Sequence, residues 1–239
     1  MKKILTFIFI CQLGWFYSQP PQFDDLLILF ADGNYPKLIR ESIKYSEKDA
    51  TKGDPLVYLY LAKGYYKISF VADRDEEYKN AFKDCLGAIG KCIGKDKDGK
   101  IREEHHEFIS QLKQTLLETI INDIDAKDYR KASGWANKVY KVSPNDIGAK
   151  YLEGACKYQS GDKGGANAFW KEADKLFTGI KDFSTMTPED KELLKLGIYE
   201  TAQCYMAMRQ AEKAKTLVNK FSKHFEGDAS FKEKFESFM

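Results

Sequence analysis

A short stretch rich in histidine and glutamate contains the residue types best suited to metal binding. The sequence "EEHHE" at residues 103–107 brings Glu103, His106 and Glu107 onto one face of a helix, because residues three and four apart are neighbours there. Imidazole and carboxylate groups on one face can bind a transition metal. Charged helix faces are usually only solvated, however. We therefore predict a solvated face and no metal site.

A polar loop, "DKDGKI", imitates a calcium-binding loop. Asp96, Asp98 and Gly99 stand at its third, fifth and sixth positions. Gly94 would be the first position and His105 the twelfth, so the strongest carboxylate ligands of such a loop are missing. We predict a polar turn here and no bound calcium.

Catalytic motifs are absent from the sequence. It contains no G-x-S-x-G elbow, no H-E-x-x-H and no C-x-x-C. The stretch "GDKGGA" lacks the residue order of a phosphate-binding loop. We predict that the protein is not an enzyme and uses no cofactor. The alternative, an enzyme or small-ligand protein on a helical fold, would depend on Glu103, His105 and His106.

The cysteines leave two interpretations open. Four of them follow Cys11, and they are Cys85, Cys92, Cys156 and Cys204. Cys85 and Cys92 are seven residues apart in one predicted helix, about 10 Å along its axis, which is beyond disulfide reach. Cys156 and Cys204 hold corresponding places in two predicted helices and could approach each other. We favour four buried free thiols over a disulfide.

The charge balance argues against nucleic acid as a partner. The 239 residues are 43% hydrophobic and 31% charged, which suits a folded domain. Without Lys2 and Lys3, which lie in the N-terminal segment discussed next, 36 basic residues face 36 acidic ones. Such a chain lacks the overall basic charge that drives binding to phosphate backbones.

The first residues, "MKKILTFIFICQLGWFYSQPPQ", have the pattern of a secretory signal peptide. Lys2 and Lys3 precede an apolar run from Ile4 to Trp15, which is too short to span a bilayer as a helix. We predict a signal peptide over residues 1–19, with cleavage near Ser18 or Gln19. The alternatives are an uncleaved anchor and lipidation at Cys11. The expected location is periplasmic or secreted, with membrane association not indicated after cleavage.

The stretch "YLEGACKYQSGDKGGANAFWKEA" predicts two helices that cross closely. We expect helices over 146–160 and 163–177, broken at Ser160-Gly161-Asp162. Glycine costs a helix roughly 1 kcal/mol, which close packing can offset. Gly154 and Ala166 are therefore interpreted as small because two helix backbones approach there.

This hairpin resembles the tetratricopeptide repeat, a helix–turn–helix unit of 34 residues with small residues at fixed places. Ile120 lies 34 residues before Gly154 at the corresponding position of the preceding unit, and its size predicts a wider separation there. Similar hairpins occur around Ala62, around Ala202 and, more weakly, around "GNY" at residues 33–35. The resemblance implies an all-α fold, a right-handed α-solenoid of stacked repeats.

We expect the signal peptide to be followed by one repeat domain over residues 20–239. The predicted repeats are 22–54, 55–98, 101–145, 146–180 and 188–228, with a capping helix at 229–238. Irregular insertions are expected at 94–107 and 178–192, and Thr187-Pro188 is expected to begin a helix. Phe231, Phe235 and Phe238 would cover the apolar end of the stack.

In tetratricopeptide repeats the first helices line a concave groove, so the resemblance also implies a protein-binding surface. The groove residues carried over are Leu59, Lys63, Tyr66, Lys67, Tyr151, Tyr158, Gln159, Tyr199, Gln203 and Met206. Such a surface suits an extended peptide or an amphipathic helix. The other interpretation is that some of these side chains pack against neighbouring helices or the C-terminal tail.

The expected function is that of an exported scaffold or adaptor, which would hold a protein or peptide of the bacterial envelope in this groove. A structural subunit that acts through its own oligomerisation is the main alternative. The predicted partner is thus a protein, and nucleic acid is not expected.

Overall fold

The computed structural model describes residues 23–180 and 182–238, and within these ranges the chain is all-helical, without a β-strand. Short 3₁₀ turns lie at Glu76–Tyr78, Phe183–Thr185, Lys223–Phe225 and Glu236–Phe238. The described α-helices are α1 (Asp24–Ala31), α2 (Tyr35–Glu47), α3 (Pro55–Ser69), α4 (Ala81–Lys95), α5 (Lys100–Glu104), α6 (His106–Asp125), α7 (Tyr129–Val139), α8 (Ile147–Gln159), α9 (Lys163–Gly179), α10 (Pro188–Ala207), α11 (Ala211–Ser222) and α12 (Ala229–Phe235).

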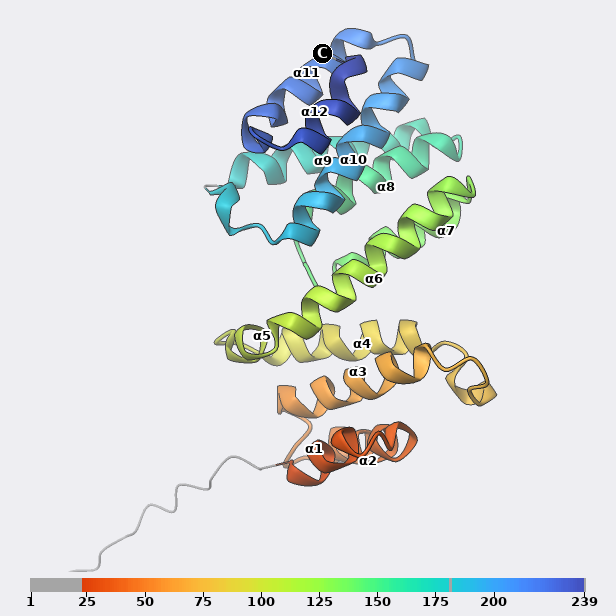
Figure 1. Ribbon diagram of the computed structural model, residues 1–239, viewed down its shortest axis with the longest axis vertical. Helices are drawn as coiled ribbons and strands as arrows, with labels where there is room; N and C mark the ends of the chain where they lie inside the picture. The colour runs from red at the N-terminus through yellow and green to blue at the C-terminus, as the bar shows by residue number, and fades with distance from the viewer. Residues whose placement is uncertain (1–22, 181, 239) are drawn as a thin grey trace, which may run out of the picture.

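Helices that follow one another in the sequence pack against one another in space. Close packing joins each helix to the next from α1 to α4, from α6 to α9 and from α10 to α11, and it also joins α8 to α10. The helices follow the long axis of the molecule in sequence order, and α6 and α7 cross its middle obliquely (Figure 1). Helix α6 packs along α7 and meets α10, but it is not closely packed along α8.

Local sequence signals set where these helices begin. Asp or Asn side chains accept a backbone hydrogen bond at the start of α2, α3, α7, α8, α9 and α12, which satisfies one free N–H of each first turn. The expected start at Thr187-Pro188 is confirmed, since the Thr187 hydroxyl accepts from the Asp190 backbone N–H. The expected break between α8 and α9 is also confirmed, with Gly161 at φ +89°.

Glycines mark two places where helices of the C-terminal half nearly touch. A Cβ atom at Gly154 would lie 2.3 Å from Trp170 Nε1, so the predicted crossing of α8 and α9 is confirmed. A closer approach joins α8 to α10. A Cβ atom at Gly148 would lie 2.5 Å from Leu194 N, and one at Gly197 would lie 2.4 Å from the carbonyl oxygen of Gly148. At Gly148 and Gly197 the nearest atoms are backbone atoms, so any larger residue there would require the backbone to move.

Two hydrophobic cores share α8 and α10. One core runs from Phe23 through α1–α7 and includes Ala149 and Leu152 on one face of α8 together with two leucines of α10. The other includes Tyr151 and Ala155 on the opposite face of α8 and continues through α9–α12. Both faces of this helix are therefore buried, and it belongs to both halves of the molecule.

The C-terminal helix covers one end of the molecule. Phe231, Phe235 and Phe238 are buried, as expected from their spacing. Lys195, buried in α10, donates to the carboxylate of Asp228, which caps α12, with Nζ–Oδ2 at 2.9 Å. Hydrogen bonds from Ser230 and then from Lys195 hold the pKa of Asp228 well below its usual range.

The predicted signal peptide and Cys11 lie outside the described residues. None of the described helices is long and apolar enough to cross a membrane. Cys85, Cys92, Cys156 and Cys204 are buried and free, in agreement with the favoured interpretation.

Candidate functional site

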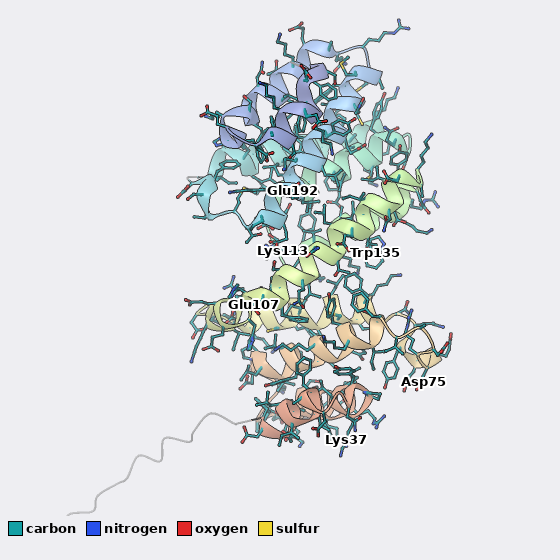
Figure 2. All side chains as sticks on the ribbon, viewed as in Figure 1. Lys37, Asp75, Glu107, Lys113, Trp135 and Glu192 are labelled. Carbon is teal, nitrogen blue, oxygen red and sulfur yellow. The ribbon has the colours of Figure 1, made fainter. Side chains whose placement is uncertain are left out.

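A hollow of about 300 Å³ opens where α1, α3 and the α5–α6 junction meet, and three of the expected groove residues lie in it. It is lined by Phe30, Lys63, Tyr66, Lys67, Glu104, His105, Glu107, Phe108 and Gln111. Glu107, labelled at the start of α6, marks its edge (Figure 2). The hollow therefore combines aromatic walls with charges of both signs.

The ammonium group of Lys63 is the central charge of this hollow. Its Nζ lies 5.3 Å from the ring centroid of Phe30 and 5.8 Å from those of Tyr60 and Phe108. No described carboxylate lies within ion-pair distance of it. Burial lowers the pKa of Lys63. Aromatic faces attract the cation, but they replace only part of its lost hydration.

Tyr66 and His105 are the other fixed members of the hollow. The Tyr66 hydroxyl lies 3.1 Å from the Thr115 hydroxyl, and its ring packs edge-on against Phe108 at 5.5 Å, so it joins α3 to α6. His105 stands at the break between α5 and α6. Burial, and then the charge of Lys63, lower the pKa of His105, which favours its neutral form. Lys63 is thus the more strongly cationic of the two groups.

The two stretches that resemble metal-binding motifs, residues 103–107 and the loop from residue 94, have structural roles in the described chain. The helix breaks at His105, so Glu103 lies in α5 while His106 and Glu107 begin α6, and the expected common helix face is not formed. The Nδ1 atom of His106 instead hydrogen-bonds the carbonyl oxygen of Glu103 at 3.0 Å.

The carboxylate of Asp96 accepts hydrogen bonds from the backbone N–H groups of Ile101 and Arg102 and from Arg102 Nε, each at 3.1 Å. Burial opposes its charge, but these bonds and the Arg102 guanidinium outweigh it, and together they lower the pKa of Asp96. Asp98 accepts from the backbone N–H of Lys100. The loop is therefore a cap for α5, which agrees with the predicted polar turn.

Five further groove residues lie on α8 and α10, away from this hollow: Tyr158, Gln159, Tyr199, Gln203 and Met206. Gln159, Gln203 and Met206 are exposed. Tyr158 is half-buried, with its ring 6.4 Å from that of Trp170. Tyr199 packs edge-on against Phe235 and Phe238, so the C-terminal residues cover part of it.

Two groove residues belong to the core, and their assignment is corrected here. Leu59 and Tyr151 are each only 1% exposed. Tyr151 packs edge-on against Phe221, and its hydroxyl donates to Asp174. Both side chains are therefore core residues. Tyr151 points inward where α8 and α10 approach closely, and Leu59 lies on the core-facing side of α3.

Glu200 is a half-buried carboxylate of α10 that lies outside the hollow beside Lys63. Its pKa is raised by burial. It stands near the Cys156 and Cys204 thiols, and its charge adds to the effect of burial, which raises the pKa of each thiol to about 12. Sequence reasoning missed Phe30 and Phe108, because the walls of the hollow come from helices that are distant in sequence.

Comparison with known proteins adds no assignment. No model of a known protein family matches the chain, and no match was found among curated proteins.

Proposed function

We propose that this chain is an exported scaffold of tetratricopeptide-like repeats that binds a protein partner in the hollow beside Lys63. Its helical hairpins would form a right-handed solenoid, and the partner would be an extended peptide or a helix of a bacterial envelope protein. The small residues at the α8–α9 crossing and the capping C-terminal helix support the repeat assignment. The N-terminal sequence pattern supports export.

The hollow around Lys63 is the observation that carries the proposal. It collects Lys63, Tyr66 and Lys67 with the aromatic rings of Phe30 and Phe108. Aromatic side chains beside a charged group are typical of the few residues that dominate binding at protein interfaces. Because Lys63 lacks an acidic partner among the described residues, an acidic side chain of the partner would complete it.

Replacing Lys63 with methionine should weaken partner binding at least tenfold and leave thermal stability nearly unchanged. Methionine keeps most of the volume and removes the charge, and a partly desolvated cation without an ion pair contributes little to folding. The immobilised full-length chain would be exposed to a bacterial envelope extract and the retained proteins identified by mass spectrometry. Affinity for each retained protein would then be measured with purified components.

The matched control is Lys37→Met, which removes the same charge from an exposed position on α2. At least one protein should be retained by the wild type and by this control and be lost from the Lys63→Met variant. The proposal fails when nothing is retained above background at low and moderate salt. It fails equally when the Lys63 variant retains every protein that the control retains.

Self-association is a second candidate function, favoured by the outer face of α1. Leu27 is 51% exposed and Ile28 57%, at the end of the molecule opposite the capped C-terminal end (Figure 1). Adjacent large apolar side chains on a surface often mark a protein contact. If the α1 faces of two copies of the chain packed together, the chain would act as a structural subunit.

Leu27→Lys is expected to shift a dimer–monomer equilibrium towards monomer by at least tenfold if α1 is such a contact. Burial of a leucine contributes about 1.5–3 kcal/mol, and a lysine would add a desolvation cost. Light scattering over a range of concentrations measures the equilibrium. Met206→Lys, also at an exposed apolar position, is the control. A wild-type mass that stays monomeric at every concentration rejects this function.

A further inference from the structure

A second hollow lies between α4 and α7 and shares no lining residue with the one beside Lys63. Its volume is about 390 Å³, and it is lined by Lys83, Lys131, Gly134, Trp135 and Lys138. Trp135 is labelled on α7 above α4 (Figure 2). Such a volume is within the range of small-ligand sites.

Trp135 forms the platform of this hollow. Its ring is half-buried and lies 5.7 Å from the Phe82 ring, tilted by 40°, so α4 supports it from one side. The Nζ atom of Lys83 lies 5.8 Å from the ring centroid. A ring held in this way offers a ligand a rigid aromatic surface whose face carries negative charge density.

The charged residues that line this hollow are all lysines. Lys131 forms an ion pair with Asp128 at 2.7 Å. Lys83 and Lys138 have no carboxylate within ion-pair distance among the described residues, and no acidic residue lines the hollow. The balanced charge of the whole chain therefore hides a local excess of ammonium groups, and these suit an anionic ligand.

Gly134 leaves the floor of the hollow bare. It lies inside α7, and a Cβ atom there would meet no atom within 4 Å. Helical glycine without a packing partner weakens a helix, and here no crossing helix compensates, in contrast to Gly148 and Gly154. A flat ligand that rests on the helix backbone beside Trp135 would use the space that a larger side chain would fill.

We propose that the hollow at Trp135 binds an acidic oligosaccharide, a chain of sugars that carry carboxylate or sulfate groups. One sugar ring stacks on Trp135, because its C–H hydrogens carry slight positive charge and fit the negative ring face. Its acidic groups, and those of the next sugar, accept hydrogen bonds from Lys83 and Lys138.

The chemistry of the lining favours a short charged sugar over a nucleic acid or a peptide. Single-stranded nucleic acid also combines stacking with charge, but it is bound along a continuous basic groove, and among the described residues this hollow offers only Lys83 and Lys138 as lysines without an ion pair. A peptide strand would need free backbone partners, and the backbone of α7 beside the hollow is engaged within the helix. Stacking and charge, the two interactions that these residues offer, are sufficient for a charged sugar.

Titration calorimetry of the full-length chain with oligogalacturonate at low salt tests the proposal. We expect saturable binding by the wild type. Trp135→Ala and the double variant Lys83→Gln/Lys138→Gln should each weaken it at least tenfold. Trp135→Phe keeps the packing on Phe82 and should weaken it less than Trp135→Ala, so a folding defect of the alanine variant can be separated from loss of the platform.

Gly134→Gln distinguishes a ligand site from a neutral surface glycine. It should raise the melting temperature, because glutamine favours helix, and it should weaken oligogalacturonate binding because the side chain fills the hollow. Gly94→Ala, at another helical glycine with no atom near its Cβ position, should raise the melting temperature with binding unchanged. Lys37→Gln should leave binding unchanged, and so should Lys63→Met, which keeps this test separate from that of the protein-binding hollow.

Three results overturn the proposal. The first is an absence of oligogalacturonate binding at millimolar concentration. The second is binding that the Trp135 and lysine variants leave unchanged. The third is equal or stronger binding of neutral maltohexaose or of a single-stranded oligonucleotide, which would show that the hollow does not select an acidic sugar.

Discussion

Replacing Gly148 with leucine is expected to lower the free energy of unfolding by about 3 kcal/mol, the upper end of typical overpacking costs. Even the first added carbon would lie 2.5 Å from Leu194 N and 2.6 Å from the carbonyl carbon of Leu193. These are backbone atoms of α10, which cannot rotate away as a side chain can. Urea unfolding followed by far-ultraviolet circular dichroism measures the loss.

Gly87→Ala is the control for this substitution. Gly87 lies in α4 with no atom within 4 Å of its Cβ position, so alanine there should raise the free energy of unfolding by about 0.5–1 kcal/mol. Gly154→Ala should fall between the two, because its added carbon meets the Trp170 side chain as well as a backbone atom. A Gly148→Leu protein as stable as the wild type would show that α8 and α10 do not cross at this glycine.

Tyr151→Ala is expected to cost about 3–5 kcal/mol of unfolding free energy, the range for large aromatic truncations in a core. The ring is almost fully buried and packs edge-on against Phe221. Thermal and urea unfolding both measure this loss. The same substitution at Tyr158, which is half-buried, should cost clearly less.

Tyr151→Phe separates the ring from its hydroxyl group. It removes only the hydrogen bond to Asp174, whose carboxylate is exposed and keeps its ion pair with Lys220, so the expected loss is about 0.5–1.5 kcal/mol. If the Tyr151→Ala protein has the same melting temperature as the wild type, Tyr151 is not a core residue and is again a candidate for the groove.

Helix boundaries were predictable where the signal is local. The break at Ser160-Gly161-Asp162 and the start at Thr187-Pro188 depend on a left-handed glycine and on capping side chains, which are properties of a few adjacent residues. Ile120 was less informative. Its size predicted a wider separation at the crossing of its hairpin, but α6 packs closely along α7, the helix that completes that hairpin.

The candidate site was less predictable because it depends on how helices are rotated about their axes. Lys63, Tyr66 and Lys67 lie in one hollow, but Phe30 and Phe108 reach it from helices far away in the sequence. Tyr151 was misplaced because groove positions were assigned by a fixed spacing. The near contact of Gly148 with Gly197 draws α8 and α10 together, and it buries a face that the spacing assigned to ligand.

The position of α8 between two cores has a consequence for how the molecule opens. Amide hydrogens are protected from exchange by the cost of the smallest opening that exposes them. Exposure of α1 disturbs one core alone and so does exposure of α12, whereas exposure of α8 or α10 strips packing from both. Exchange should therefore be slowest in α8 and α10 and faster towards each end, so that the chain opens from its termini inward and these two helices are released last.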